Sequence, residues 1–143
     1  MTPELKTAIC RAVEKEPFAR ALDLKLIELE LGRSVVEMTY RPKLMDNIYA
    51  RAHGGALFAL IDEAFETAAQ THGIIAVALN VNVTYIRPPE TGEVLRAEAC
   101  EASLTRKTAN YAIKVTNSRG QLVATCQALA YRTGQPVVLD EPK

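Results

Sequence analysis

The chain is 143 residues long, with 48% hydrophobic and 24% charged residues, and its 17 basic and 17 acidic side chains cancel. This length and composition predict one globular domain over residues 1–143, large enough to fold without a disulfide or metal staple. The balanced charge argues against nucleic acid as a partner, and the lack of an apolar run of roughly 20 residues argues against a membrane partner.

The first third of the chain is predicted to hold a helix and a hairpin. Residues 1–16 read as an N-terminal helix, capped at Thr2 and ended by Pro17. Residues 22–31 and 34–40 alternate apolar and polar side chains, which predicts two paired strands. The segment from there to residue 52 shows no regular pattern and is expected to be irregular.

Residues 54–71 form the clearest helix of the sequence, since they are rich in alanine and leucine and contain no proline. Between residues 56 and 61 every side chain is apolar, so the helix has no polar face there. A helix that is apolar all round is buried on most sides. We therefore expect this helix at the centre of the domain, with His72 and Gly73 as its terminator.

The rest of the chain is predicted to be mostly strand, in four runs at residues 74–87, 93–103, 107–117 and 121–132. Short connections favour an antiparallel sheet for the last three runs. Residues 133–143 hold two prolines and two acids and are expected to be a loose tail. The predicted fold class is therefore α+β, with a long central helix wrapped by a curved antiparallel β-sheet.

The three cysteines, Cys10, Cys100 and Cys126, form neither a disulfide framework nor a zinc-site spacing. We interpret them as reduced thiols, which favours a cytoplasmic protein. The first residues contain no continuous apolar segment, so no signal peptide is predicted.

His53-Gly54-Gly55 stands at the start of the long helix. The first N–H groups of a helix lack partners within it and carry the positive end of its dipole. Glycine lets a ligand approach that backbone closely. These residue types predict a site for negative charge developing on oxygen, such as the oxyanion of acyl transfer. The alternative is that the glycines only allow a tight loop before the helix.

Two acids, Asp62 and Glu63, interrupt the apolar helix. Asp62 shares a stripe with Gly55, Ala59 and Glu66, so small neighbours leave room for a ligand to reach its carboxylate. A carboxylate in apolar surroundings has a raised pKa and can act as a base or a nucleophile. The alternative is that the two acids mark the point where the helix leaves the core.

The separation of Gly55 and Asp62 predicts an oligomer. The two helical turns between these residues span about 10 Å, so the carboxylate cannot meet a ligand atom held at the N-terminus of its own helix. We expect the acid and the N–H donors to come from two antiparallel copies of the helix. That arrangement is a homodimer with two equal sites across its interface.

The motif N-x5-HGG-x6-D, formed by Asn47, His53, Gly54, Gly55 and Asp62, resembles that of the hotdog-fold acyl-CoA thioesterases of the phenylacetate-degradation (PaaI-like) family. The stretch NVTYIRPPETGEVLRAEA at 82–99 and the hairpin NSRGQLVA at 117–124 are also similar to that family. The resemblance covers roughly residues 20 to 132.

This resemblance implies a hotdog fold and the hydrolysis of an aryl- or medium-chain acyl-CoA without a metal or cofactor. It implies that Asp62 activates water or attacks the acyl carbon, and that the N–H of Gly54 or Gly55 from the facing subunit polarises the thioester carbonyl. Asn47 is then expected to position the water or the reacting group, and His53 to support the loop or the ligand. Dimers of this family often pair into tetramers.

Two positions depart from the family pattern. Ala50 stands where the family often has glycine, and Ala78 aligns with a Ser or Thr that binds near the attacking water in many members. Asn80, two residues further on, is expected to point the same way as Ala78 in a regular strand. Asn80 is therefore a candidate substrate-binding residue.

Basic residues near predicted strand ends, Arg87, Arg106 and Lys107, are further substrate-binding candidates, because arginine suits the geometry of CoA phosphates. The alternative for each is a solvated turn. Two tyrosines and two methionines are interpreted as packing residues: Tyr85 and Tyr111 in the sheet, Met38 and Met45 in the core.

Three other functions stay open from the sequence. A hotdog dehydratase pairs a histidine with a carboxylate of the helix, but here His53 adjoins the glycines, which fits the thioesterase motif better. A non-catalytic module that binds acyl-CoA is the second, although such a protein could lack the carboxylate that Asp62 supplies. A structural oligomer with a vestigial site is the third, and the departures at Ala50 and Ala78 keep it open.

Overall fold

The computed structural model describes residues 1–137. In chain order its elements are α1 Pro3–Lys15, α2 Pro17–Leu22, β1 Lys25–Glu30, β2 Arg33–Thr39, α3 Pro42–Met45, α4 Gly54–Gln70, β3 Ile74–Tyr85, β4 Val94–Leu104, β5 Thr108–Asn117 and β6 Leu122–Pro136. Within these residues no helix is long and apolar enough to cross a bilayer.

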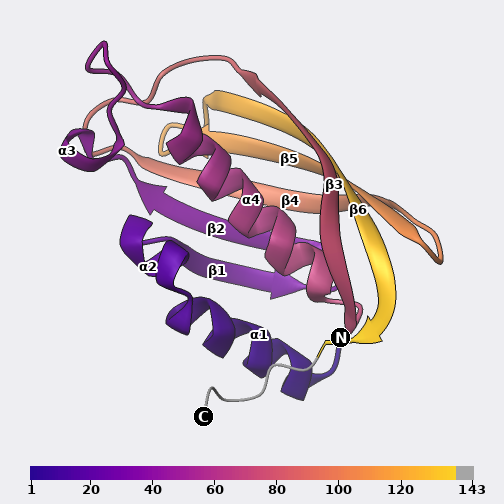
Figure 1. The fold of residues 1–143 in the computed structure, drawn as a ribbon. Helices are drawn as coiled ribbons and strands as arrows, with labels where there is room; N and C mark the ends of the chain where they lie inside the picture. The colour runs from indigo at the N-terminus through magenta and orange to yellow at the C-terminus, as the bar shows by residue number, and fades with distance from the viewer. Residues whose placement is uncertain (138–143) are drawn as a thin grey trace.

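The strands form one six-stranded sheet in the order β1-β2-β4-β5-β6-β3, and every neighbouring pair is antiparallel (Figure 1). The predicted hairpin of β1 and β2 is therefore confirmed. The strand after the central helix, β3, crosses to the far edge of the sheet and pairs with β6. This crossover leaves β3 as an edge strand beside α4.

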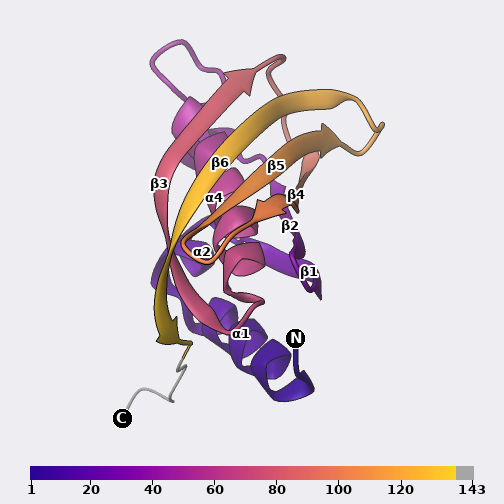
Figure 2. The same ribbon diagram turned by 90° about the vertical axis from the view of Figure 1, so that its right-hand side faces the viewer.

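The sheet curves around α4, which lies in its concave face as the predicted central helix (Figure 2). Leu60, Ile61 and Ala64 of α4 are fully buried, and Phe65 packs edge-to-face on Tyr111 of β5 with ring centroids 5.4 Å apart. Met38 and Met45 are buried in the same core, as predicted. The apolar helix thus buries its surface against the inward side chains of the sheet, which confirms the α+β hotdog arrangement.

Three segments differ from the sequence-based expectation. Pro17 was expected only to end a helix, but it also begins α2, because proline fits the first helical position. The strand predicted from residue 22 consequently starts at Lys25. The short helix α3 interrupts the segment expected to be irregular. Strand β6 continues to Pro136, so the loose tail predicted from residue 133 is wrong that far, and residues 138–143 lie outside the described residues.

Candidate active site

The N-terminus of α4 is built around His53. This residue has extended backbone angles and caps the helix, because its Nδ1 accepts the N–H of Gly55 at 2.8 Å. A Cβ on Gly55 would stand 3.0 Å from that nitrogen, so only glycine fits the cap without a shift. The Gly55 N–H is therefore already used, whereas no hydrogen bond of the Gly54 N–H is found in the part of the chain that the structure describes.

Tyr85 holds the first residue of α4 from the other side. Its hydroxyl donates to the Gly54 carbonyl at 3.0 Å, and a Cβ on Gly54 would lie 3.2 Å from its ring. The sequence interpretation of Tyr85 as a packing residue of the sheet is incomplete, since half of this side chain is exposed and its ring lies against the helix start. No local pattern signals this contact, because β3 reaches α4 only through the fold.

The loop before α4 is organised by Asn47. Its Oδ1 accepts the N–H groups of Tyr49 at 2.9 Å and Arg51 at 3.3 Å, and the His53 N–H donates to the Met45 carbonyl at 2.7 Å. Ala50 has a φ of +52°, a left-handed conformation that favours glycine. Although alanine replaces the family glycine at this position, the backbone keeps the left-handed conformation that glycine favours.

Asp62 lies two turns along α4, half-buried next to the buried Ala59. Burial raises the pKa of its carboxyl above the ordinary value of 3.8. The acid also acts electrostatically on Cys126 of β6, whose thiol pKa is raised to about 11, first by burial and then, more weakly, by Asp62. The raised pKa agrees with the sequence expectation for a carboxyl in apolar surroundings, and the role of Asp62 as a base or nucleophile stays a prediction.

Glu63, the next residue, is almost fully buried, with 3% of its surface exposed. Its Oε1 has no hydrogen-bond partner among the described residues. Burial raises its pKa to about 8. The negative charges of Glu16, Glu66 and Asp62 add to the effect, as does a hydrogen bond that the protonated carboxyl shares with Glu16. The helix remains buried beyond this point at Ala64 and Phe65, so the alternative that the acids mark its exit from the core is wrong.

Asn80 does not share the orientation of Ala78. Ala78 pairs with Ala130 of β6 and Asn80 with Leu129, so one extra residue of β3 bulges between them. Directly paired residues point to the same face of a sheet, and successive residues of β6 point to opposite faces. Asn80 therefore points to the opposite face from Ala78, and it cannot take the place of the family Ser or Thr by sharing its orientation.

The three basic candidates do not converge within one chain. Arg87 donates its backbone N–H to the Val123 carbonyl at 3.2 Å, near one end of β6. The Lys107 carbonyl accepts the Arg132 N–H at 2.8 Å, near the other end. These two positions of β6 are roughly 30 Å apart in an extended strand. Arg106 adjoins Lys107 in the exposed β4–β5 turn, so only these two can act together within a chain.

Residues 49–124, which include the helix start and Asp62, match the family described as the thioesterase superfamily. The chain belongs to the thioesterase superfamily. Among its curated relatives, the acyl-coenzyme A thioesterase PaaI of Escherichia coli (strain K12) is 32% identical over 121 residues, which cover 85% of this chain and 86% of the relative.

Solved structures agree with this assignment. The E. coli PaaI protein from the phenylacetic acid degradation operon superposes on this thioesterase with a TM-score of 0.88 and 30% identity, covering 94% of this chain and 97% of that one. The smu.793 protein of Streptococcus mutans UA159, bound to acetyl CoA, superposes with a TM-score of 0.75 and 26% identity over 80% of this chain and 91% of that one. The thioesterase is thus a PaaI-like hotdog enzyme, and the preference for this class over a dehydratase is confirmed.

Proposed function

We propose that the thioesterase hydrolyses an acyl-CoA with an aryl- or medium-chain acyl group to the free acid and CoA. The observation that carries this proposal is the half-buried carboxyl of Asp62 on the side of a helix whose N-terminus offers the Gly54 N–H. The acyl-CoA thioesterase named among the relatives and the neighbour bound to acetyl CoA support the substrate class.

In this mechanism Asp62 takes a proton from water or attacks the acyl carbon itself. The Gly54 N–H donates to the thioester oxygen as negative charge develops on it, and the helix dipole adds to the stabilisation. Asn47 and His53 hold the loop that presents this donor. Because the Gly55 N–H already donates to His53, we favour Gly54 over Gly55 as the oxyanion donor.

We infer that the acid and the donor come from two subunits of a homodimer. Along one helix the two groups stay about 12 Å apart, which is too far for one reacting carbonyl. The edge strand β3 is a suitable dimer contact, since Val77 and Leu79 are about half exposed there. The same pairing would enclose an apolar channel for the acyl group, and two such dimers are expected to form the tetramer. A cytoplasmic location stays a prediction.

CoA phosphates are expected near Arg106 and Lys107, with Arg87 contributing from another subunit. The first two side chains are adjacent and exposed, and Lys107 Nζ already lies 3.3 Å from the Tyr131 hydroxyl. Arg87 lies at the opposite end of the sheet, so it reaches the same CoA only if the oligomer brings that end close. Asn80, on the face away from Ala78, is retained as a weaker candidate for substrate contact.

The first experiment measures thiol release from phenylacetyl-, benzoyl-, hexanoyl- and palmitoyl-CoA by the wild type, Asp62→Asn and the control Glu37→Gln. We expect Asp62→Asn to lower turnover about 10²–10⁴-fold, the usual contribution of a general base, with the oligomer unchanged by light scattering. Glu37→Gln, which removes a carboxylate on the sheet, should match the wild type. Unchanged turnover in Asp62→Asn would remove this residue from the mechanism, and binding without release would favour the acyl-CoA-binding module.

Subunit mixing tests the shared site. Gly54→Pro removes the proposed donor while proline suits the first position of the helix. When Asp62→Asn and Gly54→Pro subunits are unfolded, mixed in equal amounts and refolded, half of the dimers carry one intact site, so about a quarter of wild-type activity should return. A site contained within one chain predicts no recovery at all.

A further inference from the structure

Three glutamates from distant parts of the chain meet beside α4. Glu16 joins α1 to α2, and Glu63 and Glu66 belong to α4. One carboxylate oxygen of each lies within 4.8 Å of the other two. The three residues differ in burial: Glu63 is buried, Glu16 half-buried and Glu66 exposed, so the cluster opens from the core toward the surface.

The buried member of this group has one carboxyl oxygen that accepts no hydrogen bond. Glu63 Oε1 has no hydrogen bond among the described residues, although 97% of the side chain is shielded from solvent. An unpaired carboxyl oxygen at that depth is costly, and nearly all such groups find a donor or a cation. The acidic neighbours Glu16, Glu66 and Asp62 raise the pKa of this carboxyl, and its protonated form hydrogen-bonds to Glu16. A divalent cation bound to these carboxylates would replace the shared proton.

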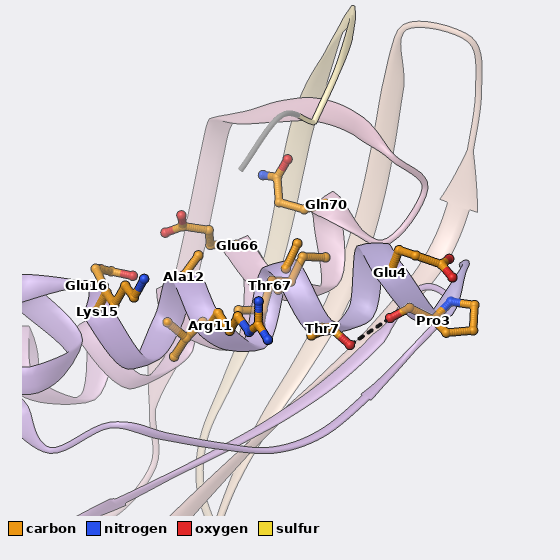
Figure 3. Close-up of a pocket in the computed structure, with 13 residues that line it drawn as sticks. Pro3, Glu4, Thr7, Arg11, Ala12, Lys15, Glu16, Glu66, Thr67 and Gln70 are labelled. Atoms are coloured by element: carbon orange, nitrogen blue, oxygen red, sulfur yellow. Dashed lines mark hydrogen bonds between the residues drawn. The ribbon is translucent and has the colours of Figure 1, made fainter. Parts of the chain in front are cut away.

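A cleft of about 740 Å³ between α1 and α4 leads to the cluster. Glu16 and Glu66 stand side by side at one end of it, with Lys15 next to Glu16 (Figure 3). Arg11 and Lys15 of α1 also line this cleft, while Thr67 and Gln70 of α4 add polar oxygens. The cluster is thus open to solutes from one side and closed by the core on the other.

We propose that Glu16, Glu63 and Glu66 bind one divalent cation of the oxygen-preferring class, such as Mn²⁺, Mg²⁺ or Ca²⁺. These ions hold carboxylate oxygens at about 2.0–2.6 Å, which places two ligands up to roughly 5 Å apart, and the three oxygens already lie within that range. The cation supplies a positively charged partner for the Glu63 carboxyl, one oxygen of which accepts no hydrogen bond. It also ties the α1–α2 junction to α4 directly beside Asp62, as a structural clamp outside the proposed chemistry.

The test titrates Mn²⁺ into the metal-free full-length protein and follows free Mn²⁺ by electron paramagnetic resonance. We expect saturable binding of one ion per chain, and at least about a tenfold loss of affinity in Glu16→Gln and Glu63→Gln. Glu14→Gln, which removes the same charge from an exposed position of α1, should bind as the wild type does. Glu16 is half-buried at a helix junction, so its variant keeps the test valid if Glu63→Gln does not fold.

Two results would overturn the site. Binding that is equally weak in all four proteins would show only general attraction to acidic side chains. No saturation at millimolar Mn²⁺ would show that the three carboxyls share protons and hold no metal. Because both readouts measure binding, they are independent of whether Asp62 proves catalytic.

Discussion

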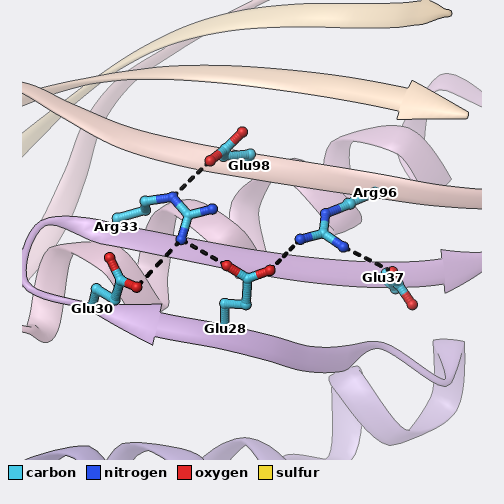
Figure 4. A network of polar contacts seen from close by, with 6 residues as sticks. All are labelled: Glu28, Glu30, Arg33, Glu37, Arg96 and Glu98. Carbon is cyan, nitrogen blue, oxygen red and sulfur yellow. Dashed lines mark hydrogen bonds and ion pairs between the residues drawn. The ribbon is translucent and has the colours of Figure 1, made fainter. Parts of the chain in front are cut away.

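Two groups of carboxylates in this thioesterase differ in the charge of their neighbours, and pKa values in the two groups shift in opposite directions. On the face of the sheet formed by β1, β2 and β4, Arg33 contacts Glu28 at 2.8 Å and Glu98 at 2.7 Å, and Arg96 bridges Glu28 and Glu37 (Figure 4). Hydrogen bonds from Arg33 and Arg96 lower the pKa of Glu28. Around α4 the carboxyls of Glu16, Glu63 and Glu66 lie within 4.8 Å of one another and also feel the charge of Asp62, and burial raises the pKa of all four.

The same chemical group is thus stabilised as an anion in one place and as an acid in the other. The carboxylates of the sheet group are solvated and contact the same arginine side chains, so their negative charges are neutralised by neighbouring guanidinium groups. The α4 group is partly withdrawn from water, so each charge raises the cost of the next. The paired carboxylates are neutralised by arginine and add little to stability, whereas the carboxyls along α4 remain available for a proton, a substrate or a cation.

The largest expected effect is the pH dependence that Glu63 imposes on stability. Its folded pKa of about 8 exceeds the ordinary value of 4.5, so the folded state keeps a proton that the unfolded state loses. Stability should therefore fall as pH rises from 5 to 8, by up to about 1.4 kcal/mol per pH unit for one proton. Urea unfolding in buffer with EDTA should show this slope reduced in Glu63→Gln.

Glu14→Gln serves as the matched control for that measurement, since it removes an exposed acid from α1. It should keep the wild-type slope between pH 5 and 8. If Glu63→Gln also keeps this slope, Glu63 is ionised in the folded protein, and the contrast between the two groups of carboxylates does not hold.

A smaller effect is expected at the start of α4. The Gly54 N–H has no hydrogen-bond partner among the described residues and, like the α4 carboxyls, remains available to substrate. Tyr85→Phe removes the hydroxyl that donates to the Gly54 carbonyl but keeps the ring. One hydrogen bond of about 0.5–1.5 kcal/mol corresponds to a loss of roughly 2–10-fold in kcat, with KM little changed. Thiol-release kinetics measure both constants. An equal kcat, or a loss of stability in place of turnover, would make Tyr85 a packing residue after all.

The residues of the candidate site that lie close together in the sequence could be placed from it. His53, Gly54, Gly55 and Asp62 belong to one helix and its cap, so spacing alone placed them, and the apolar composition of α4 placed the helix at the centre. Alternation likewise predicted the strands, because each faces the core on one side only.

What could not be predicted depends on contacts between distant segments. Glu16 meets Glu63 only because the α1–α2 junction packs against α4, and Tyr85 meets Gly54 because β3 crosses to the far edge of the sheet. The bulge between Ala78 and Asn80 contains no glycine or proline that would indicate it in the sequence. The two-residue period of a regular strand therefore assigned Asn80 to the wrong face of the sheet. Register decides such contacts, and register is a property of the folded sheet.

The smallest expected effect concerns the paired carboxylates. Arg33→Gln leaves Glu28 and Glu98 without this guanidinium, yet the network is partly exposed, so unfolding in urea should lose only about 1 kcal/mol at neutral pH. The lowered pKa of Glu28 makes its stabilisation present above the ordinary value of 4.5 and lost as pH falls below it, so the two proteins should converge in acid. Lys25→Gln, whose partner Asp23 is 3.5 Å away and mostly solvated, should change almost nothing. A loss of stability in Arg33→Gln that persists unchanged in acid would show that the arginine stem acts by packing, and the sheet group would then owe its order to burial, as the α4 group does.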